Sequence, residues 1–320
     1  MQQLFYELLQ VAVGQADCLG RGPSEEEWHQ LYDMARRHQL TGICYRGVER
    51  LFDYGLRAPQ DLSIDWMADV EQLKEDNEKV LKRLQLVQKR LAEKDIRSSV
   101  LSAQGAAARY KAELRSLCQP VGIDLYVDCE VGRAVRFVEL TGQQHVRRDA
   151  NCVFLDKWED TPIRLHCLLD FRANPLKTGT IRRWLQEHKE QFFEKEGALT
   201  LPSQSLAMVY ALLELHGSVM AGRATMRQLM DCYSLLRNAD GHFAALDAGQ
   251  TQEDTLKTLG IAGFAKGVMW LLQRSLLVER QMMICAPSEA EGRFIEAQIM
   301  NGRQLWPMLC RYLLQTLFSL

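Results

Sequence analysis

Long apolar runs are missing from this chain of 320 residues, and none approaches the length of about 18 residues that a transmembrane helix needs. Residues 1–7 lack the basic and apolar regions of an export signal. The nine cysteines are scattered, odd in number and never spaced as Cys-x-x-Cys, so they indicate neither a zinc knuckle nor a disulfide framework. We therefore expect a cytoplasmic protein with reduced thiols and no transmembrane segment.

An excess of charge of one sign is also missing. Lys+Arg 39 against Asp+Glu 41 leave a net charge of -2, so the chain as a whole has no attraction to nucleic acid or to an anionic membrane. Gly217 and Gly222 are not followed by Lys-Ser/Thr, which excludes the common phosphate loop. The composition, 47% hydrophobic and 25% charged, is that of an ordinary globular protein.

The longest periodic pattern predicts one long helix between Trp66 and Ile96. Its stripe consists of Val70, Leu73, Asn77, Val80, Leu84, Val87 and Leu91. Because the pattern lasts only about three heptads, we expect the stripe to pack on the chain's own domain. The alternative is a homodimeric coiled coil in which Asn77 fixes the register.

After this helix the pattern changes to short strands. Strands are predicted at 98–101, 123–127, 151–155 and 163–171, and helices at 106–114 and 133–140. From Ile181 onward the chain is predicted to be helical again. The fold class is therefore α+β, predominantly helical, with a helical section at 1–95, a small mixed α/β unit at 96–172 and a helical domain at 173–320.

Residues 122–128 are the most informative stretch. They read Gly-Ile-Asp-Leu-Tyr-Val-Asp, a strand in which alternate residues share a face, so that Gly122, Asp124 and Tyr126 point the same way. An enzyme that holds two carboxylates on one cation would place Asp at both 122 and 124, and a third carboxylate on a neighbouring strand. Here the first position is Gly.

These segments resemble the uncharacterised nucleotidyltransferase family of bacteria, within the polymerase-β-like nucleotidyltransferase superfamily. The family pattern is a long helix, a strand ending in Leu-Lys-Gly, a helix, a Gly-Asp-Ile-Asp-Leu-Leu-Val strand, an apolar-Glu-Leu-His strand and a helical half. The counterparts here are 100–105 (Val-Leu-Ser-Ala-Gln-Gly), 121–127 (Val-Gly-Ile-Asp-Leu-Tyr-Val) and 163–166 (Ile-Arg-Leu-His). The resemblance covers roughly 60–240 and implies a small nucleotidyltransferase-like sheet flanked by helical sections.

The sequence departs from the family pattern where the chemistry would be. Gln104 replaces the Lys before Gly105, Gly122 replaces the first Asp, and Arg164 replaces the third carboxylate. Only Asp124 is left of the expected ligand set, and one carboxylate rarely holds Mg²⁺. We predict that the Arg164 guanidinium pairs with Asp124 where the cation would sit, the alternative being that Arg164 points to solvent.

A rearranged site is a further alternative. Asp128 shares the face of Asp124, while His166 and Asp170 share a face of the later strand, so these residues are also candidates for lining a site. Asp124 and Asp128 stand about 13 Å apart on an extended strand, which does not suit one ion. His166, between apolar neighbours, is predicted to be a hydrogen-bonded structural residue rather than a ligand or base.

Three hypotheses for the function follow. The first is a catalytically impaired nucleotidyltransferase, a pseudoenzyme that binds a nucleotide or a partner and has no cofactor. The second is an active enzyme that uses Mg²⁺ to move a nucleoside monophosphate from a nucleoside triphosphate to a small molecule or protein. The third is a non-enzymatic scaffold whose helical stripe and apolar segment 305–320 bind a protein partner or form a homodimer. All three are compatible with the sequence.

Overall fold

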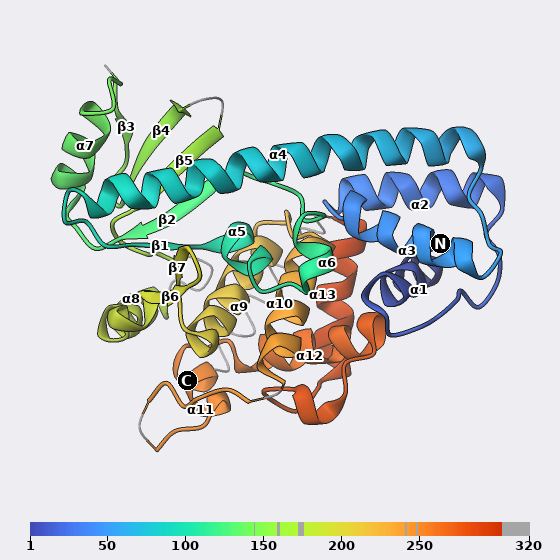
Figure 1. The fold of residues 1–320 in the computed structure, drawn as a ribbon. Helices are drawn as coiled ribbons and strands as arrows, with labels where there is room; N and C mark the ends of the chain where they lie inside the picture. Colours follow the sequence, from blue (N-terminus) through green and yellow to red (C-terminus); the bar gives the residue numbers. More distant parts are fainter. Residues whose placement is uncertain (144, 159–160, 172–175, 241, 248, 303–320) are drawn as a thin grey trace.

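The computed structural model describes residues 1–302 except 144, 159–160, 172–175, 241 and 248. This part of the chain contains thirteen α-helices and a five-stranded mixed sheet, which confirms the predicted α+β, predominantly helical class (Figure 1). None of the helices described is long and apolar enough to cross a membrane.

The first three helices form a compact group at one end of the molecule. They are α1 (Gln2–Val13), α2 (Glu25–Arg37) and α3 (Thr41–Asp53). Helix α2 begins at a capping box, in which the Ser24 hydroxyl accepts from the Glu27 amide and the Glu27 carboxylate accepts from the Ser24 amide. Acidic residues in its first turn and basic ones in its last favour the same helix through its dipole.

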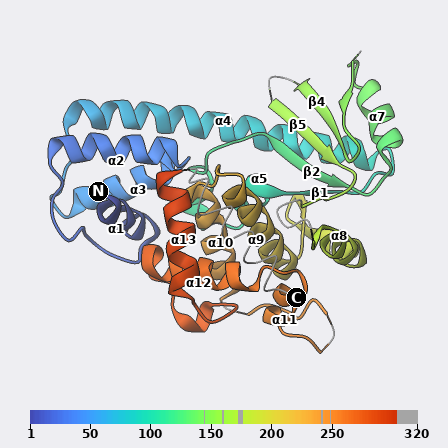
Figure 2. The same ribbon diagram turned by 180° about the vertical axis from the view of Figure 1, so that it is seen from behind.

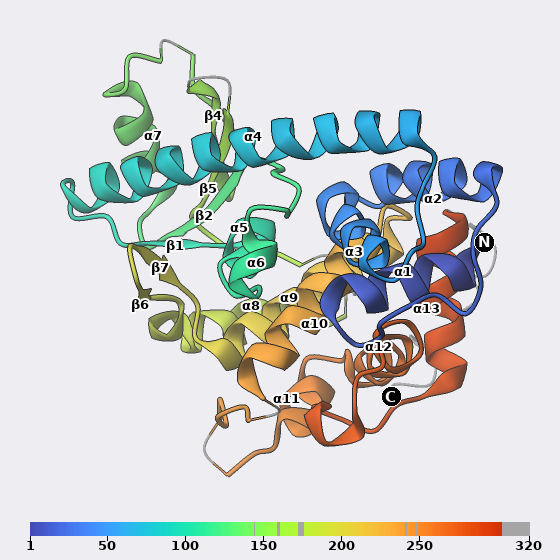
Figure 3. The same ribbon diagram turned by 45° about the vertical axis from the view of Figure 1, so that its right-hand side comes forward.

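Helix α4 (Gln60–Ala92) runs from this group to the sheet, as predicted from its periodicity (Figures 1 and 3). Its first half buries Trp66 and Val70 against the N-terminal helices, and its second half buries Leu84 and Val87 against the sheet. Asn77 donates to the backbone carbonyl of Ser116 at 2.9 Å. The stripe is therefore covered by the chain's own core, and it is not available for a coiled coil.

The sheet has the strand order β1-β2-β5-β4-β3, with β2 and β5 parallel and the other neighbours antiparallel. The strands are β1 (Ser98–Val100), β2 (Ile123–Val127), β3 (Arg147–Arg148), β4 (Cys152–Trp158) and β5 (Thr161–His166). One face carries Leu125, Val153 and Leu165 against α4 and α7 (Val131–Glu139). The other face carries Asp124, whose neighbour two residues on, Tyr126, packs on Phe192.

The C-terminal half is helical and lies below the sheet in the view of Figure 2. It comprises α8 (Thr178–Glu187), α9 (Gln204–Met220), α10 (Met226–Ala239), α11 (Gln252–Thr258), α12 (Ala262–Leu276) and α13 (Glu289–Asn301), with short 3-10 turns at Lys189–Phe192 and Arg280–Met282. Its apolar core is continuous with that of α1–α3. The three-part division at 95 and 172 stays a prediction.

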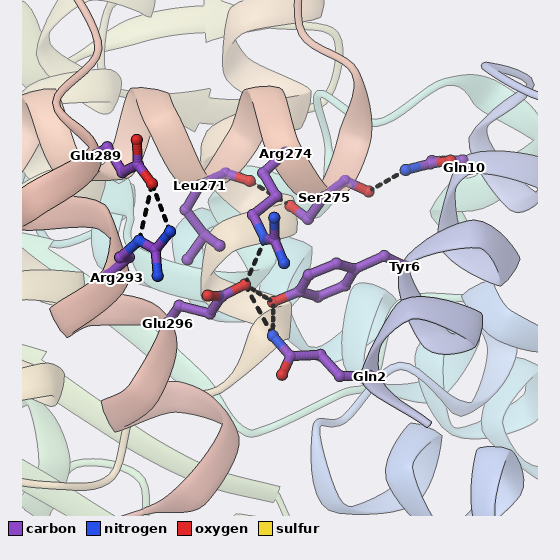
Figure 4. A network of polar contacts seen from close by, with 9 residues as sticks. All are labelled: Gln2, Tyr6, Gln10, Leu271, Arg274, Ser275, Glu289, Arg293 and Glu296. Atoms are coloured by element: carbon purple, nitrogen blue, oxygen red, sulfur yellow. Dashed lines mark hydrogen bonds and ion pairs between the residues drawn. The ribbon is translucent and has the colours of Figure 1, made fainter.

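Helix α1 is fastened to the far end of the chain by polar contacts (Figure 4). Oε1 of Glu296 on α13 accepts hydrogen bonds from Tyr6 at 2.9 Å, from Gln2 at 2.8 Å and from Arg274 at 3.0 Å. Gln10 donates to the Ser275 carbonyl at 3.1 Å. The first and last described helices are thus joined by specific bonds as well as by apolar packing.

Three predicted elements need correction. The helix expected at 106–114 is two short helices, α5 (Ser102–Ala107) and α6 (Ala112–Arg115), because Tyr110 turns inward between them. The strand expected to reach residue 171 ends at His166. The section predicted as helical contains a hairpin, β6 (Glu194–Glu196) and β7 (Leu199–Leu201). The apolar segment 305–320 lies outside the described residues.

Candidate functional site

The site is built on two parallel strands that bring Asp124 and Arg164 side by side. In the register of β2 and β5, Asp124 lies opposite Arg164, and Tyr126 lies opposite His166. Nη2 of Arg164 lies 2.5 Å from Oδ2 of Asp124, so the predicted ion pair is present. Nε2 of His166 lies 2.7 Å from Oδ1 of the same carboxylate. Each oxygen of Asp124 thus has its own nitrogen partner.

Charge stabilises the ionised form of Asp124 although this carboxylate is buried. Asp124 is only 4% exposed, and burial alone would raise its pKa, but the His166 hydrogen bond and the charges of His166 and Arg164 lower it. Burial alone would lower the pKa of His166, yet its hydrogen bonds to Asp124 and Cys152 raise that pKa to about 9. At neutral pH one carboxylate is therefore held between an imidazolium and a guanidinium.

A row of side chains continues from Asp124 across four strands. Directly paired positions run from Asp124 to Arg164, then to Phe154 on β4 and to Arg147 on β3. The Arg147 guanidinium stacks 4.1 Å from the centre of the Phe154 ring. Arg147, Phe154 and Arg164 line a cavity of about 440 Å³ together with Gly122. The cavity wall thus combines two cationic groups with an aromatic ring.

Gly122 has the backbone of a glycine position rather than of a carboxylate ligand. Its φ is +99°, in a region that L side chains rarely adopt. A Cβ added there would lie 3.0 Å from the carbonyl oxygen of Pro162 and 3.1 Å from its ring. The backbone at this position therefore favours glycine over any residue with a Cβ.

A second polar pair adjoins the site, and no motif in the sequence indicated it. The Leu101 amide donates to the Asp124 carbonyl at 2.8 Å, and the next residue, Ser102, has a φ of +54°. Ser102 donates to Glu214 on α9 at 2.7 Å. Burial raises the pKa of Glu214 to about 7, against the Ser102 hydrogen bond and with help from the Asp124 charge. Because the two residues are 112 positions apart in the sequence, no local motif could predict this contact.

The other predicted site residues lie apart from Asp124. Asp128 forms ion pairs with Arg97 and, at 3.6 Å, with Lys189. Asp170 accepts from Arg182 at 2.9 Å, because β5 ends before it and the chain leaves the sheet.

The two residues of the Leu-Lys-Gly counterpart lie on α5 and are not part of the lining of the cavity beside Arg164. Gln104 lines a cavity of about 690 Å³ bordered by α4 and the β6–β7 hairpin, and neither Asp124, Arg164 nor His166 is part of its lining. A Cβ at Gly105 would lie 2.9 Å from the Val100 carbonyl oxygen, so this glycine lets α5 approach β1.

The chemistry of these residues does not fit Mg²⁺. That ion requires several oxygen ligands, and here a single carboxylate is flanked by Arg164 and His166, which carry charge of the ion's own sign. No group of three or more His, Cys, Asp or Glu side chains among the described residues is arranged to hold a metal ion. Of the rearranged set, Asp124 and His166 are in contact, whereas Asp128 pairs with Arg97 and Asp170 with Arg182.

The fold and the site define a nucleotidyltransferase-like protein, in which a small sheet is joined to a helical half. The chain belongs to the uncharacterised nucleotidyltransferase family, whose model matches residues 24–276. No curated protein and no solved structure matches the chain significantly.

Proposed function

We propose that this member of the uncharacterised nucleotidyltransferase family is a pseudoenzyme that binds the phosphate groups of a nucleotide without Mg²⁺. The observation that carries the proposal is the double engagement of Asp124, with Arg164 on one carboxylate oxygen and His166 on the other. A guanidinium is permanently charged and presents several donors, so it can meet phosphate oxygens where a family enzyme would use a cation.

The cavity beside Arg164 gives the phosphates a place to bind. The Arg164 side chain is 51% exposed, so that it reaches from the buried carboxylate into the cavity that Arg147 and Phe154 also line. Gly122, which directly precedes β2, also lines the cavity, and it contributes no side chain there. Two arginines and an aromatic ring suit a ligand that has both phosphates and a ring.

Calorimetric titration of ATP, once with Mg²⁺ and once with a chelator, tests the proposal. We expect equal affinity in both conditions. Arg164→Ala should weaken binding about tenfold, the value of one charge-assisted hydrogen bond. Arg148→Ala, an exposed arginine of the same sheet that is not part of the cavity lining, serves as the matched control.

Asp124→Asn separates the proposal from an active enzyme. In the pseudoenzyme this change releases Arg164 and His166 from their carboxylate, so ATP should bind at least as tightly as before. In a metal-dependent transferase the same change removes a metal ligand, and binding in Mg²⁺ should be lost. Metal-dependent binding together with a nucleotidylated product in mass spectrometry would overturn the proposal.

A further inference from the structure

Two free thiols lie together on the face of the sheet opposite to Asp124. Cys129 follows β2 and Cys167 follows β5, and these strands are parallel neighbours, so both cysteines lie at the same edge of the sheet. Both cysteines pack against the apolar cluster that the sheet forms with α4 and α7. Both are half-buried, and their thiols hydrogen-bond each other.

The surroundings of Cys129 favour its thiolate. It directly precedes Glu130, the N-cap of α7, and the Ala134 amide of that helix contacts its sulfur. Arg133 lies nearby and donates to the Lys94 carbonyl at 2.7 Å, which keeps its guanidinium at this end of the sheet. The Cys167 hydrogen bond, with these groups, lowers the pKa of Cys129 although burial opposes the change.

Cys167 is suited to be the resolving cysteine, the thiol that attacks the oxidised Cys129. Its hydrogen bond to Cys129, together with burial, raises its pKa, so it stays a thiol while Cys129 ionises. Its amide is held by the Asn151 carbonyl at 2.8 Å, just beyond the end of β5. One reactive sulfur and one resolving sulfur are thus placed side by side.

We propose that Cys129 and Cys167 form a reversible dithiol site that hydrogen peroxide oxidises to a disulfide. The Cys129 sulfur attacks one peroxide oxygen, an S–O bond forms, the O–O bond breaks, and the departing hydroxide takes a proton to become water. The Cys167 sulfur then attacks the Cys129 sulfur, an S–S bond forms, the S–O bond breaks, and a second water leaves with the Cys167 proton. Two electrons from the two thiols reduce one peroxide to two waters.

The disulfide would join the carboxyl ends of β2 and β5. Those are the strands that carry Asp124 and His166, so oxidation would tie together the two strands of the ion pair from the opposite face. The dithiol site does not depend on nucleotide binding and can be tested without any nucleotide. A small thiol such as dithiothreitol would reverse the reaction.

Peptide mapping of the intact chain after hydrogen peroxide treatment is the test. Free thiols are blocked by alkylation, and each cysteine peptide is then read separately by mass spectrometry. We expect a peptide linking Cys129 to Cys167, the loss of two hydrogens per chain, and full recovery of both thiols with dithiothreitol. Cys18, which is exposed and has no thiol neighbour assigned to it, should remain alkylatable under the same treatment.

Two variants make the result specific. Cys167→Ser should stop the reaction at a Cys129 sulfenic acid, which dimedone traps. Cys152→Ser removes a buried cysteine of β4 near the same strands and should leave the cross-link unchanged. If either variant fails to fold, the folded wild type is alkylated instead and the order in which its cysteines react is followed. We expect Cys129 to react before Cys152. Peroxide that oxidises Cys18 and leaves Cys129 and Cys167 reduced, or that links Cys129 to Cys152, would overturn the proposal.

Discussion

Gly122 and Pro162 lie in such close contact that a side chain at position 122 would touch the proline backbone: the Cβ would be 3.0 Å from the Pro162 carbonyl oxygen. The positive φ of Gly122 adds strain for any other residue. The backbone at this position therefore favours glycine over an Asp side chain.

Gly122→Asp should therefore fail to rebuild a metal site and should destabilise the protein by about 1–3 kcal/mol. Urea unfolding measures the loss, and calorimetry with Mg²⁺ tests for metal binding. Gly55→Asp is the matched control, because Gly55 has a φ of +79° but nothing within 4 Å of its Cβ. If Gly122→Asp bound Mg²⁺ at full stability, our reading of this backbone would be wrong.

The charged His166 should make the protein less stable at alkaline pH. Its pKa is raised to about 9 in the folded state, against about 6.5 when unfolded, so the stability is complete below pH 6.5 and is lost as pH rises through 9. His166→Gln should remove about 1–3 kcal/mol at pH 6 and much less at pH 10. Urea unfolding at both pH values checks this. His29→Gln, on the exposed side of α2, should change neither value.

Glu214 should produce a pH effect in a different window. Its pKa is raised to about 7 in the folded protein, whereas an unfolded Glu ionises near 4.3, so folding favours the protonated form. Stability is complete below pH 4.3 and is lost as pH rises through 7. Glu214→Gln keeps an acceptor for Ser102 and should make the protein about 1–3 kcal/mol more stable at pH 8, with little change at pH 4. Thermal melts between pH 4 and pH 8 should show that the stability of the variant depends less on pH than that of the wild type. An equal pH dependence in the two proteins would contradict the prediction.

Leu84 should behave as a core residue rather than as an interface residue. It is 1% exposed and packs between α4 and the sheet, so Leu84→Ala should cost about 2–5 kcal/mol. Leu81, 42% exposed on the same helix, is the control, and its replacement by Ala should cost about 0.5 kcal/mol or less. Urea unfolding gives both values. A change of mass in sedimentation without a loss of stability would instead support a coiled coil.

Elements with a repeating pattern could be predicted closely from the sequence. The stripe of α4 identified a long helix, and the alternation in residues 123–127 gave the bounds of β2 as observed. These predictions succeeded because the spacing of apolar residues within one helix or strand depends only on nearby residues of the same element. The expectation that Arg164 lies on the face of Asp124 came from the family resemblance, which makes the two strands neighbours.

Elements that depend on distant contacts could not be predicted. The alanine-rich run at 106–114 favours one helix, but Tyr110 must reach Asp231, to which it donates at 2.9 Å, and the helix breaks there. Glu194–Glu196 carries no strand signal, and it pairs only because Leu199 and Leu201 are buried next to it. The Ser102–Glu214 hydrogen bond could not be predicted either, because its partners are distant in the sequence.

The bonds from Gln2 and Tyr6 to Glu296 have a consequence for synthesis of the chain. Tyr6 and its acceptor are 290 residues apart, so α1 leaves the ribosome long before its partner exists. At translation rates of roughly 5–20 residues per second, the wait is on the order of 15–60 s. During that time the apolar face of α1 has no α12 to cover it, so this surface stays exposed until synthesis of the chain is nearly finished.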